Sequence, residues 1–468
     1  DAKPEKALLD LPVTSAAGDH RYISASAKFF AVALSGGGGP VGVFPLDYCG
    51  KYTNDTPKIE GHTSGCTDTA FSPFNDNLLA TGSSDATVKL WQIPEGGLTE
   101  TLREPAADLV GHNKPISFIE WNPVANNVLA VATRVPEVRL WDVNTGKEAL
   151  KFSSPSMIQD MSWNYNGSIL SLSGKDKKIR LVDPRKADTM NQAHESAKTQ
   201  KVLFLGGTKY MLTTGFTNTS TRQFKVWDYR TFKEPVNSVD VDNAAGVLNP
   251  FYDPDTSILY LAGKGDGNIR YYELTKKGKE SHAINDHRTS SSTKGICMLP
   301  KRAYDVMKCE VASFLRLTAG KHTVERTTFT VPRRSEEFQD DIYPDTYAGK
   351  PALSASAWLG GEDKDPVKAK VTPEFGVSSG PRTPSNAAGG GGGGAPSSPV
   401  KSPAPVTPIA EENDTKEEEE APTPVSRGLA SPTPDSKVQA LEKELEEARA
   451  RIAELEKENQ ELKKKANA

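Results

Sequence analysis

The sequence predicts an all-β propeller of seven blades, followed by a C-terminal α-helical coiled coil. Short apolar runs alternate with clusters of Gly, Asn, Asp and Pro up to about residue 375, a pattern typical of strands and turns. A signature running from a histidine to a tryptophan recurs through the same region with a nearly constant period. The last thirty residues carry an unbroken heptad of apolar positions.

The signature is clearest in two neighbouring copies. Gly61-His62 recurs fifty residues later as Gly111-His112, and Trp91-Gln92 recurs fifty residues later as Trp141-Asp142. Fainter copies continue, and the blades are expected to end near residues 44, 91, 141, 182, 227, 272 and about 316. A period of about 40–45 residues with a His and a Trp-Asp pair is typical of WD repeats, in which each blade has four strands.

The apolar runs locate individual strands. The clearest ones span four or five residues and are expected to be strands: 31–34, 78–81, 128–132, 169–172, 202–205 and 258–262. Together with the repeats, these runs predict a propeller over residues 1–330.

The repeated polar residues are expected to be structural. A buried Trp, His and Asp need hydrogen-bond partners, and a chain through Thr81 or Ser83 would satisfy them in the blade that ends at Trp91. Val135 replaces the turn aspartate in the next blade, so its network is expected to be incomplete. The predicted network residues are His62, Asp85, Trp91, His112, Trp141, Asp176, Trp227 and Asp266.

Composition changes sharply near residue 375. Residues 376–434 are rich in Pro, Gly, Ser and Glu and have too little apolar surface to fold, so they are predicted to be a disordered linker. Residues 435–468 are predicted to form the coiled coil.

The heptad predicts self-association. Val438, Leu445, Ile452 and Asn459 occupy position a, and Leu441, Ala448, Leu455 and Leu462 occupy position d. Arg451 and Glu456 flank Ile452 and Leu455 in a pattern linked to three-stranded coils, whereas Asn459 at position a favours two strands. A parallel trimer is therefore favoured and a dimer remains open.

Bulk composition excludes several functions. A net charge of −4 and a pI near 6.1 give no basic signal for nucleic acid, and no run of eighteen apolar residues predicts a membrane span. The four cysteines are widely spaced, which indicates neither a disulfide framework nor a zinc site and favours the reducing cytosol. The sequence contains no recognisable catalytic or cofactor-binding motif. The glycine run at 36–39, for example, lacks the Lys of a phosphate-binding loop. These features predict a binding scaffold and not an enzyme.

Longer segments resemble one family. The stretches 88–94 (VKLWQIP), 162–168 (SWNYNGS), 251–257 (FYDPDTS), 263–271 (GKGDGNIRY), 298–302 (MLPKR) and 338–346 (FQDDIYPDT) resemble those of coronins, actin-associated WD-repeat proteins with a propeller, a variable linker and a short coiled coil. The resemblance implies binding to filamentous actin (F-actin) and to the actin-related protein 2/3 complex, in the cytoplasm at the actin cytoskeleton. It also implies that residues 331–375 pack back on the propeller, with Tyr343 and Trp358 as apolar anchors.

The same resemblance implies two differences at the N-terminus. Coronins begin with a strand that pairs with the last blade and closes the ring, and this chain, which begins at Asp1, is expected to be truncated and to leave that blade with an unpaired edge. The family also carries an actin-binding arginine early in its first blade, whereas the corresponding stretch, 8–15 (LLDLPVTS), contains none.

Basic clusters are the candidate actin contacts, because the exposed surface of actin is acidic. They are Lys175, Lys177, Lys178, Arg180, Lys301 and Arg302. The alternative for each cluster is an ordinary solvated surface. The alternative for the whole chain is a general WD-repeat scaffold in membrane traffic that makes no direct contact with filaments.

Overall fold

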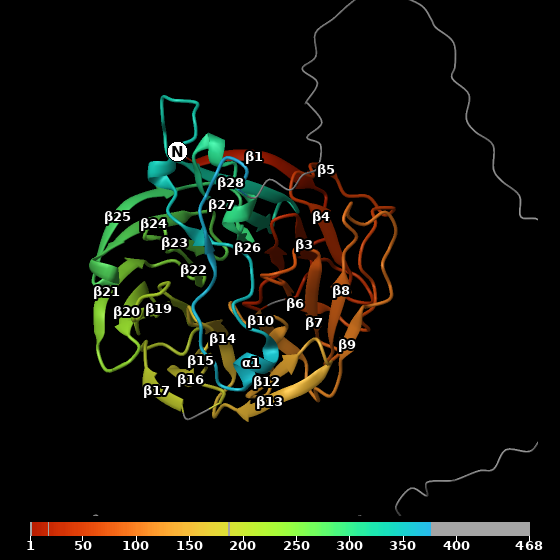
Figure 1. Cartoon of the computed structure of the whole chain (residues 1–468), viewed down its shortest axis with the longest axis horizontal. Coiled ribbons are helices and arrows are strands. Elements are labelled where there is room, and N and C mark those ends of the chain that lie inside the picture. Colours follow the sequence, from red (N-terminus) through yellow and green to blue (C-terminus); the bar gives the residue numbers. More distant parts are fainter. Residues whose placement is uncertain (1, 17, 186–187, 376–468) are drawn as a thin grey trace, which may run out of the picture. The chain divides into compact units, whose positions relative to one another are not determined.

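The strands of the computed structural model surround a common axis in seven sheets, with a separate two-stranded ladder (Figure 1). The model describes residues 2–16, 18–185 and 188–375. The first strands of neighbouring sheets contact one another, which makes them the inner strands of the ring. The predicted seven-bladed propeller is confirmed, and the predicted coiled coil lies outside the described residues.

The first four blades follow one another along the chain. Their strands are, in blade 1, β2 (Ile23–Ala25), β3 (Phe29–Ala33) and β4 (Val41–Pro45); in blade 2, β6 (Cys66–Phe71), β7 (Leu78–Ser83), β8 (Val88–Gln92) and β9 (Ala107–Leu109); in blade 3, β10 (Ile116–Trp121), β11 (Val128–Thr133), β12 (Glu137–Asp142) and β13 (Lys147–Ser153); in blade 4, β14 (Ile158–Trp163), β15 (Leu170–Gly174), β16 (Lys178–Val182) and β17 (Asp188–Gln192).

The remaining blades close the ring. Their strands are, in blade 5, β18 (Lys201–Phe204), β19 (Tyr210–Phe216), β20 (Arg222–Asp228) and β21 (Pro235–Asp242); in blade 6, β22 (Leu248–Asp253), β23 (Ile258–Gly263), β24 (Ile269–Thr275) and β25 (Glu280–His287); in blade 7, β26 (Thr293–Met298), β27 (Glu310–Thr318), β28 (Val324–Thr330), β1 (Ala2–Leu9) and the short β5 (Gly50–Lys51).

Burial on both faces explains why the second strand of each blade is rich in apolar residues. Each sheet packs between two neighbours, so all residues of β3, β11, β15 and β19 are buried. Outer strands such as β13 and β25 are largely exposed and carry charged residues instead. The six predicted strand segments overlap β3, β7, β11, β15, β18 and β23, and these predictions are confirmed.

The ring is closed by the N-terminal strand. β1 pairs antiparallel with β28, with Ala2 opposite Phe329 and Leu8 opposite Val324, and Figure 1 shows β1 beside β28. The prediction of an unpaired edge on the last blade is therefore wrong. The pairing uses backbone groups along the open edge of β28, so a strand with a mixed side-chain pattern can form it without an apolar run.

The end of blade 7 also differs from its predicted position. Residue 316 lies on β27, the second strand of the blade, and Thr327 on β28 occupies the register position of Trp91, because Met298, Phe314 and Thr327 pair across this blade as Phe71, Leu79 and Trp91 do across blade 2. Two 3-10 turns between β26 and β27, η2 (Lys301–Ala303) and η3 (Val306–Lys308), lengthen this blade. The added turns shift the repeat beyond its expected period.

The connections sort the chain between two faces of the ring. Consecutive strands of a blade are antiparallel, so successive connections lie on alternate faces. The first face carries the turns between second and third strands and the links between blades. The second face carries the turns between first and second strands and between third and fourth strands, including η1 (Lys276–Gly278).

Residues 331–375 extend over the second face as a segment that includes η4 (Asp340–Ile342), β29 (Thr346–Tyr347), α1 (Ala355–Leu359) and β30 (Lys368–Ala369). Figure 1 shows it in blue across the ring. The side chain of Ser354 caps α1 by accepting a hydrogen bond from the Ala357 N–H. We call this segment the extension.

Two aromatic residues anchor the extension. Trp358 is fully buried, its indole N–H donates to the Gly167 carbonyl at 2.9 Å, and its ring meets that of Trp163 edge-on at 5.7 Å. Tyr343 is buried, and its hydroxyl donates to the Glu310 carbonyl at 2.8 Å. Each anchor therefore combines apolar burial with one satisfied polar group.

The described residues contain no helix of the length and apolar character needed to cross a membrane.

Two adjacent leucines of β1 test the closure of the ring. Leu8 is 1% exposed and packs in the core shared with Phe30 and Leu315, whereas Leu9 is 45% exposed. We expect Leu8→Ala to lower the free energy of unfolding by about 2–5 kcal/mol through the cavity it creates. Leu9→Ala, the matched control, should change it by less than about 0.5 kcal/mol. Equal denaturation midpoints for the two variants in urea would contradict a closing role for β1.

Candidate functional site

A hydrogen-bonded chain runs through blade 2. The Trp91 indole N–H donates to Thr81 Oγ1 at 2.8 Å, Thr81 Oγ1 lies 2.8 Å from His62 Nε2, and His62 Nδ1 lies 3.0 Å from Asp85 Oδ2. A neutral imidazole fits this order, with Nε2 accepting from Thr81 and Nδ1–H donating to Asp85. Burial lowers the pKa of His62 despite the nearby Asp85 carboxylate, which is consistent with the neutral form.

Blade 5 contains a second chain that the sequence interpretation missed in part. The Trp227 indole N–H donates to Thr213 Oγ1 at 2.9 Å, and Thr213 Oγ1 lies 2.8 Å from His194 Nε2. His194 is buried and was not among the predicted network residues. Its separation from Thr213 is 19 residues, the same as that between His62 and Thr81, and this spacing could have revealed it.

Blade 3 has a shorter network. Val131 occupies the position of the Thr81 hydroxyl, because Leu129 faces Trp141 as Leu79 faces Trp91. The Trp141 indole N–H therefore donates directly to His112 Nε2 at 3.2 Å. His112 Nδ1 has no partner among the described residues, and Val135 stands at the turn position where blade 2 has an aspartate.

Asp176 and Asp266 have different partners from those we expected. Asp176 accepts two hydrogen bonds from Arg180, at 3.2 and 2.5 Å, and Asp266 accepts one from Arg222 at 2.9 Å. Arginines on neighbouring strands thus replace the His and Trp in blades 4 and 6. Arg180 is 2% exposed, so its prediction as an actin contact is wrong; its guanidinium neutralises the turn carboxylate instead.

The remaining basic candidates lie on opposite faces. Lys175 and Lys178 are exposed and Lys177 is half-buried, all in or next to the turn between β15 and β16 on the first face. Lys301 and Arg302 lie in η2, between the first two strands of blade 7, on the second face. The two groups therefore cannot form one contact surface.

Lys301 and Arg302 hold the second face together. Lys301 Nζ lies 2.8 Å from Asp253 Oδ1 and 2.5 Å from Asp255 Oδ2, and the Thr346 hydroxyl of the extension donates to the same Asp255 oxygen at 2.6 Å. Arg302 makes a two-pronged ion pair with Asp76, at 2.6 and 2.9 Å. These pairs link blades 2, 6 and 7 and the extension, which occupies both side chains structurally.

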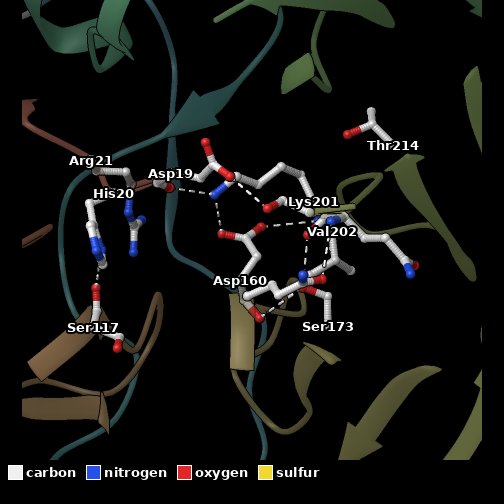
Figure 2. A network of polar contacts seen from close by, with 12 residues as sticks. Asp19, His20, Arg21, Ser117, Asp160, Ser173, Lys201, Val202 and Thr214 are labelled. Carbon is white, nitrogen blue, oxygen red and sulfur yellow. Dashed lines mark hydrogen bonds and ion pairs between the residues drawn. The ribbon is translucent and has the colours of Figure 1, made fainter. Parts of the chain in front are cut away.

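A second polar network lies where the link from β1 to β2 crosses the centre of the first face (Figure 2). Asp19 Oδ1 lies 2.8 Å from Lys264 Nζ, and Asp19 Oδ2 accepts from Thr199 at 2.6 Å. Lys201 Nζ bridges the Asp19 carbonyl and Asp160 Oδ1, at 3.1 Å each. We call these residues, with His20 and Arg21, the central cluster.

His20 and Arg21 extend the central cluster to other blades. His20 Nδ1 lies 3.0 Å from the Ser117 carbonyl, and Figure 2 marks this contact with a dashed line. The Arg21 guanidinium donates hydrogen bonds to Glu120 at 2.5 Å and to Asp68 at 3.4 Å. Residues 19–21 thereby contact blades 2, 3, 5 and 6, and Lys201 connects them to Asp160 of blade 4. No local sequence pattern marks this cluster, because its members come from blades far apart in the chain.

Burial sets the ionisation of the acidic groups near the central cluster. Burial would raise the pKa of Asp19, but hydrogen bonds from Lys264 and Thr199 outweigh it and the pKa is lowered. Burial raises the pKa of Asp68 to about 7 and also raises that of Glu120, although Arg21 favours the charged form of both. The arrangement is that of a structural ion-pair network that ties the N-terminal link to the ring.

The predicted oligomerisation residues Val438, Leu441, Leu445, Arg451, Ile452, Leu455, Glu456, Asn459 and Leu462 lie outside the described residues.

Comparisons with known proteins agree with this architecture. Family models match residues 54–92 (WD domain, G-beta repeat), residues 324–366 (a type of WD40 repeat) and residues 1–51 (a domain of unknown function, DUF1899). Coronin-2A of Homo sapiens is 39% identical over 381 residues, which cover 80% of this chain and 72% of that protein. Coronin-A of Dictyostelium discoideum is 42% identical over 377 residues, covering 80% of this chain and 84% of that protein. The crystal structure of the WD40 domain of Toxoplasma gondii coronin superposes with a TM-score of 0.76 at 30% identity, covering 80% of this chain and 97% of that domain.

The buried histidines predict a loss of stability in acid. Burial lowers the pKa of His112 to about 4 and that of His194 to about 3, whereas unfolded histidines bind protons near pH 6.5. The unfolded chain thus binds more protons between these values, so this contribution to stability is present above pH 6.5 and is lost as the pH falls towards 4.

We therefore expect the thermal midpoint to fall between pH 7 and pH 4.5, and to fall less in His112→Gln, which keeps an acceptor for Trp141. His322→Gln, which changes an exposed histidine, is the control and should follow the wild type. An equal fall in all three proteins would show that His112 does not contribute to the acid sensitivity.

Proposed function

The chain belongs to the coronin family, and from this premise we propose that it binds the sides of actin filaments, bundles or crosslinks them, and regulates actin dynamics with the actin-related protein 2/3 complex. The proposal places the protein in the cytoplasm at the actin cytoskeleton. The observation that supports it best is an exposed basic and apolar surface on the first face of blades 3 and 4. We call this surface the basic patch.

The basic patch contains four exposed cations and the half-buried Lys177, all from three connections between strands. Its members are Lys114, Arg134, Lys175, Lys177 and Lys178. Backbone hydrogen bonds join these turns: the Arg134 N–H donates to the Pro115 carbonyl at 2.9 Å and the Lys175 N–H donates to the Met157 carbonyl at 2.9 Å. The Ser154 N–H donates to the Pro136 carbonyl at 2.6 Å and so connects the blade 3 turn to the blade 4 link. The cations are therefore held on one continuous surface.

Exposed apolar side chains lie within the basic patch. Val135 is 37% exposed and Met157 is 43% exposed. The one acidic residue of the β15–β16 turn, Asp176, is already paired with Arg180. A surface with unopposed lysines around a small apolar centre suits an acidic protein partner, with the charges directing association and the apolar contacts slowing release.

The basic residues predicted on the second face, Lys301 and Arg302, are less suited to filament contact. They are engaged in ion pairs, and the extension covers part of this face. The first face is therefore the one proposed to meet the filament.

Self-association multiplies a weak single contact. Most helical stability in proteins comes from packing of an amphipathic face, so folding and assembly of residues 435–468 are expected to be coupled. Linked propellers rebind at a high local concentration, which raises the overall affinity without any new contact. By family resemblance, the same assembly is proposed to recruit the actin-related protein 2/3 complex. The proposed oligomer is a parallel trimer, with a dimer as the alternative.

Charge reversal tests the basic patch. We expect the Lys175→Glu, Lys178→Glu double variant to bind filaments at least about tenfold more weakly in cosedimentation, because the reversed charges repel an acidic partner. A tenfold change corresponds to a loss of about 1.4 kcal/mol of binding free energy. The Lys147→Glu, Lys279→Glu double variant is the matched control, because both lysines are exposed but belong to or adjoin outer strands. Wild-type binding should also weaken when the salt concentration is raised.

Equal binding by the two double variants would refute the patch, and no cosedimentation of the wild type at either salt concentration would favour a scaffold without filament contact.

Deletion of residues 434–468 tests the role of self-association. We expect the truncated protein to be monomeric by analytical ultracentrifugation, to keep the thermal midpoint of its propeller, and to lose most filament bundling in low-speed sedimentation. Undiminished bundling by a monomeric truncation would contradict the proposal. The mass of the full chain in the same instrument separates a trimer from a dimer.

A further inference from the structure

A groove lies on the second face beside the extension. It consists of two adjoining cavities with volumes of about 730 and 300 Å³. Residues shared by both cavities mark where they meet: Tyr165, Tyr252, Pro254, Tyr347 and Pro366. Tyr347 and Pro366 belong to the extension, so this segment forms part of the wall of the groove.

Aromatic and proline side chains dominate the lining of the smaller cavity and continue into the larger one beside polar and charged residues. The smaller cavity adds Trp121, Trp163 and Phe204, and the larger adds Tyr304 and Pro300. Hydrogen bonds hold two of the tyrosines in place, because Tyr347 donates to the Pro123 carbonyl at 3.1 Å and Tyr304 donates to the Leu299 carbonyl at 3.0 Å. The groove therefore presents rigid aromatic surfaces.

The charged floor of the groove is neutralised within the protein. Lys301 pairs with both Asp253 and Asp255, and the remaining oxygen of Asp253 accepts from the Thr256 hydroxyl at 2.6 Å. Arg302 of the larger cavity pairs with Asp76, and Glu120 of the smaller cavity pairs with Arg21. A ligand thus meets paired charges and apolar rings on the floor and lysines at the rim. The rim carries three exposed lysines, Lys276, Lys277 and Lys368, beside the single carboxylate of Glu273.

Two of the rim lysines stand on a constrained turn. Lys276, Lys277 and Gly278 have consecutive positive φ angles of 47, 60 and 98°. Left-handed conformations are unfavourable for non-glycine residues and persist where the surrounding structure imposes them. Here a Cβ on Gly278 would come within 2.9 Å of Leu205, which shows how closely the turn packs on blade 5. This packing fixes both lysines at the edge of the groove, although Lys276 also lies 2.6 Å from Glu280.

We propose that this groove binds a proline-rich segment of a partner protein that is flanked by acidic residues. A polyproline II chain is already extended and has no internal hydrogen bonds, and grooves lined with aromatic residues are its usual binding sites. The acidic flank complements the rim lysines. Addition of a strand fits less well, because β29 and β30, the strands of the extension whose residues line the groove, are only two residues long. The inference concerns the second face and does not depend on filament binding by the first.

Peptide binding measured by fluorescence anisotropy tests this inference. The probe is a labelled peptide of eight prolines followed by four glutamates, and the comparison peptide ends in four lysines. We expect saturable binding of the acidic probe to the full chain and at least about fivefold weaker binding of the lysine peptide. No binding at about 1 mM probe, the weak end of measurable association, would overturn the proposal.

Two variants locate the binding site. Tyr165→Ala removes a ring shared by both cavities, and we expect it to weaken probe binding about fivefold. Tyr48→Ala, at a 39% exposed tyrosine outside the groove, is its matched control and should bind normally. The Lys276→Glu, Lys277→Glu variant changes only exposed side chains and should abolish the preference for the acidic probe.

Thermal midpoints near that of the wild type confirm that the variants fold. Unchanged affinity in Tyr165→Ala, or an unchanged acidic preference in the lysine variant, would overturn the proposal. Filament cosedimentation of Tyr165→Ala should equal that of the wild type, so failure here is distinguishable from failure of the proposed actin function.

Discussion

Burial of both faces of every sheet is the constraint on which this structure depends. An apolar blade can bury its two faces only between two other blades, so the row of sheets must curve back on itself and close. The pairing of β1 with β28 provides that closure by joining the first strand of the chain to its last blade. The buried Leu8, beside the exposed Leu9, shows that this strand takes part in the core as well as in the backbone ladder.

Polar networks then fix what apolar packing leaves free. The central cluster ties residues 19–21 to blades on the far side of the ring through Lys201, Asp160 and Lys264. On the second face, Lys301 joins two turns to the extension through Asp255. Within blades, Trp–Thr–His chains or Arg–Asp pairs hold the turns. Each buried charge in these networks has a partner, which is the condition under which burial of charge is tolerated.

These structural duties decide which residues remain for partners. Lys175 and Lys178 of the β15–β16 turn stay exposed near Val135 and Met157, whereas Arg180, Lys301 and Arg302 are held in ion pairs. The extension covers part of the second face and, in doing so, forms one wall of the aromatic groove. The two faces therefore suit different partners: an acidic surface on the first and a slender proline-rich segment on the second.

The sequence by itself determined the seven blades, the strand positions and the His62–Trp91 chain, because those features arise from local periodicity and from residues within one blade. Tertiary structure decided the rest. Whether a lysine or arginine is exposed depends on acids distant in sequence, such as Asp76 for Arg302, and no local pattern encodes that encounter. The closing role of β1 was likewise hidden, since backbone pairing along an open edge requires no apolar side-chain signature. His194 lies between these cases, because its 19-residue spacing to Thr213 was present in the sequence but its partner became evident only in the folded blade.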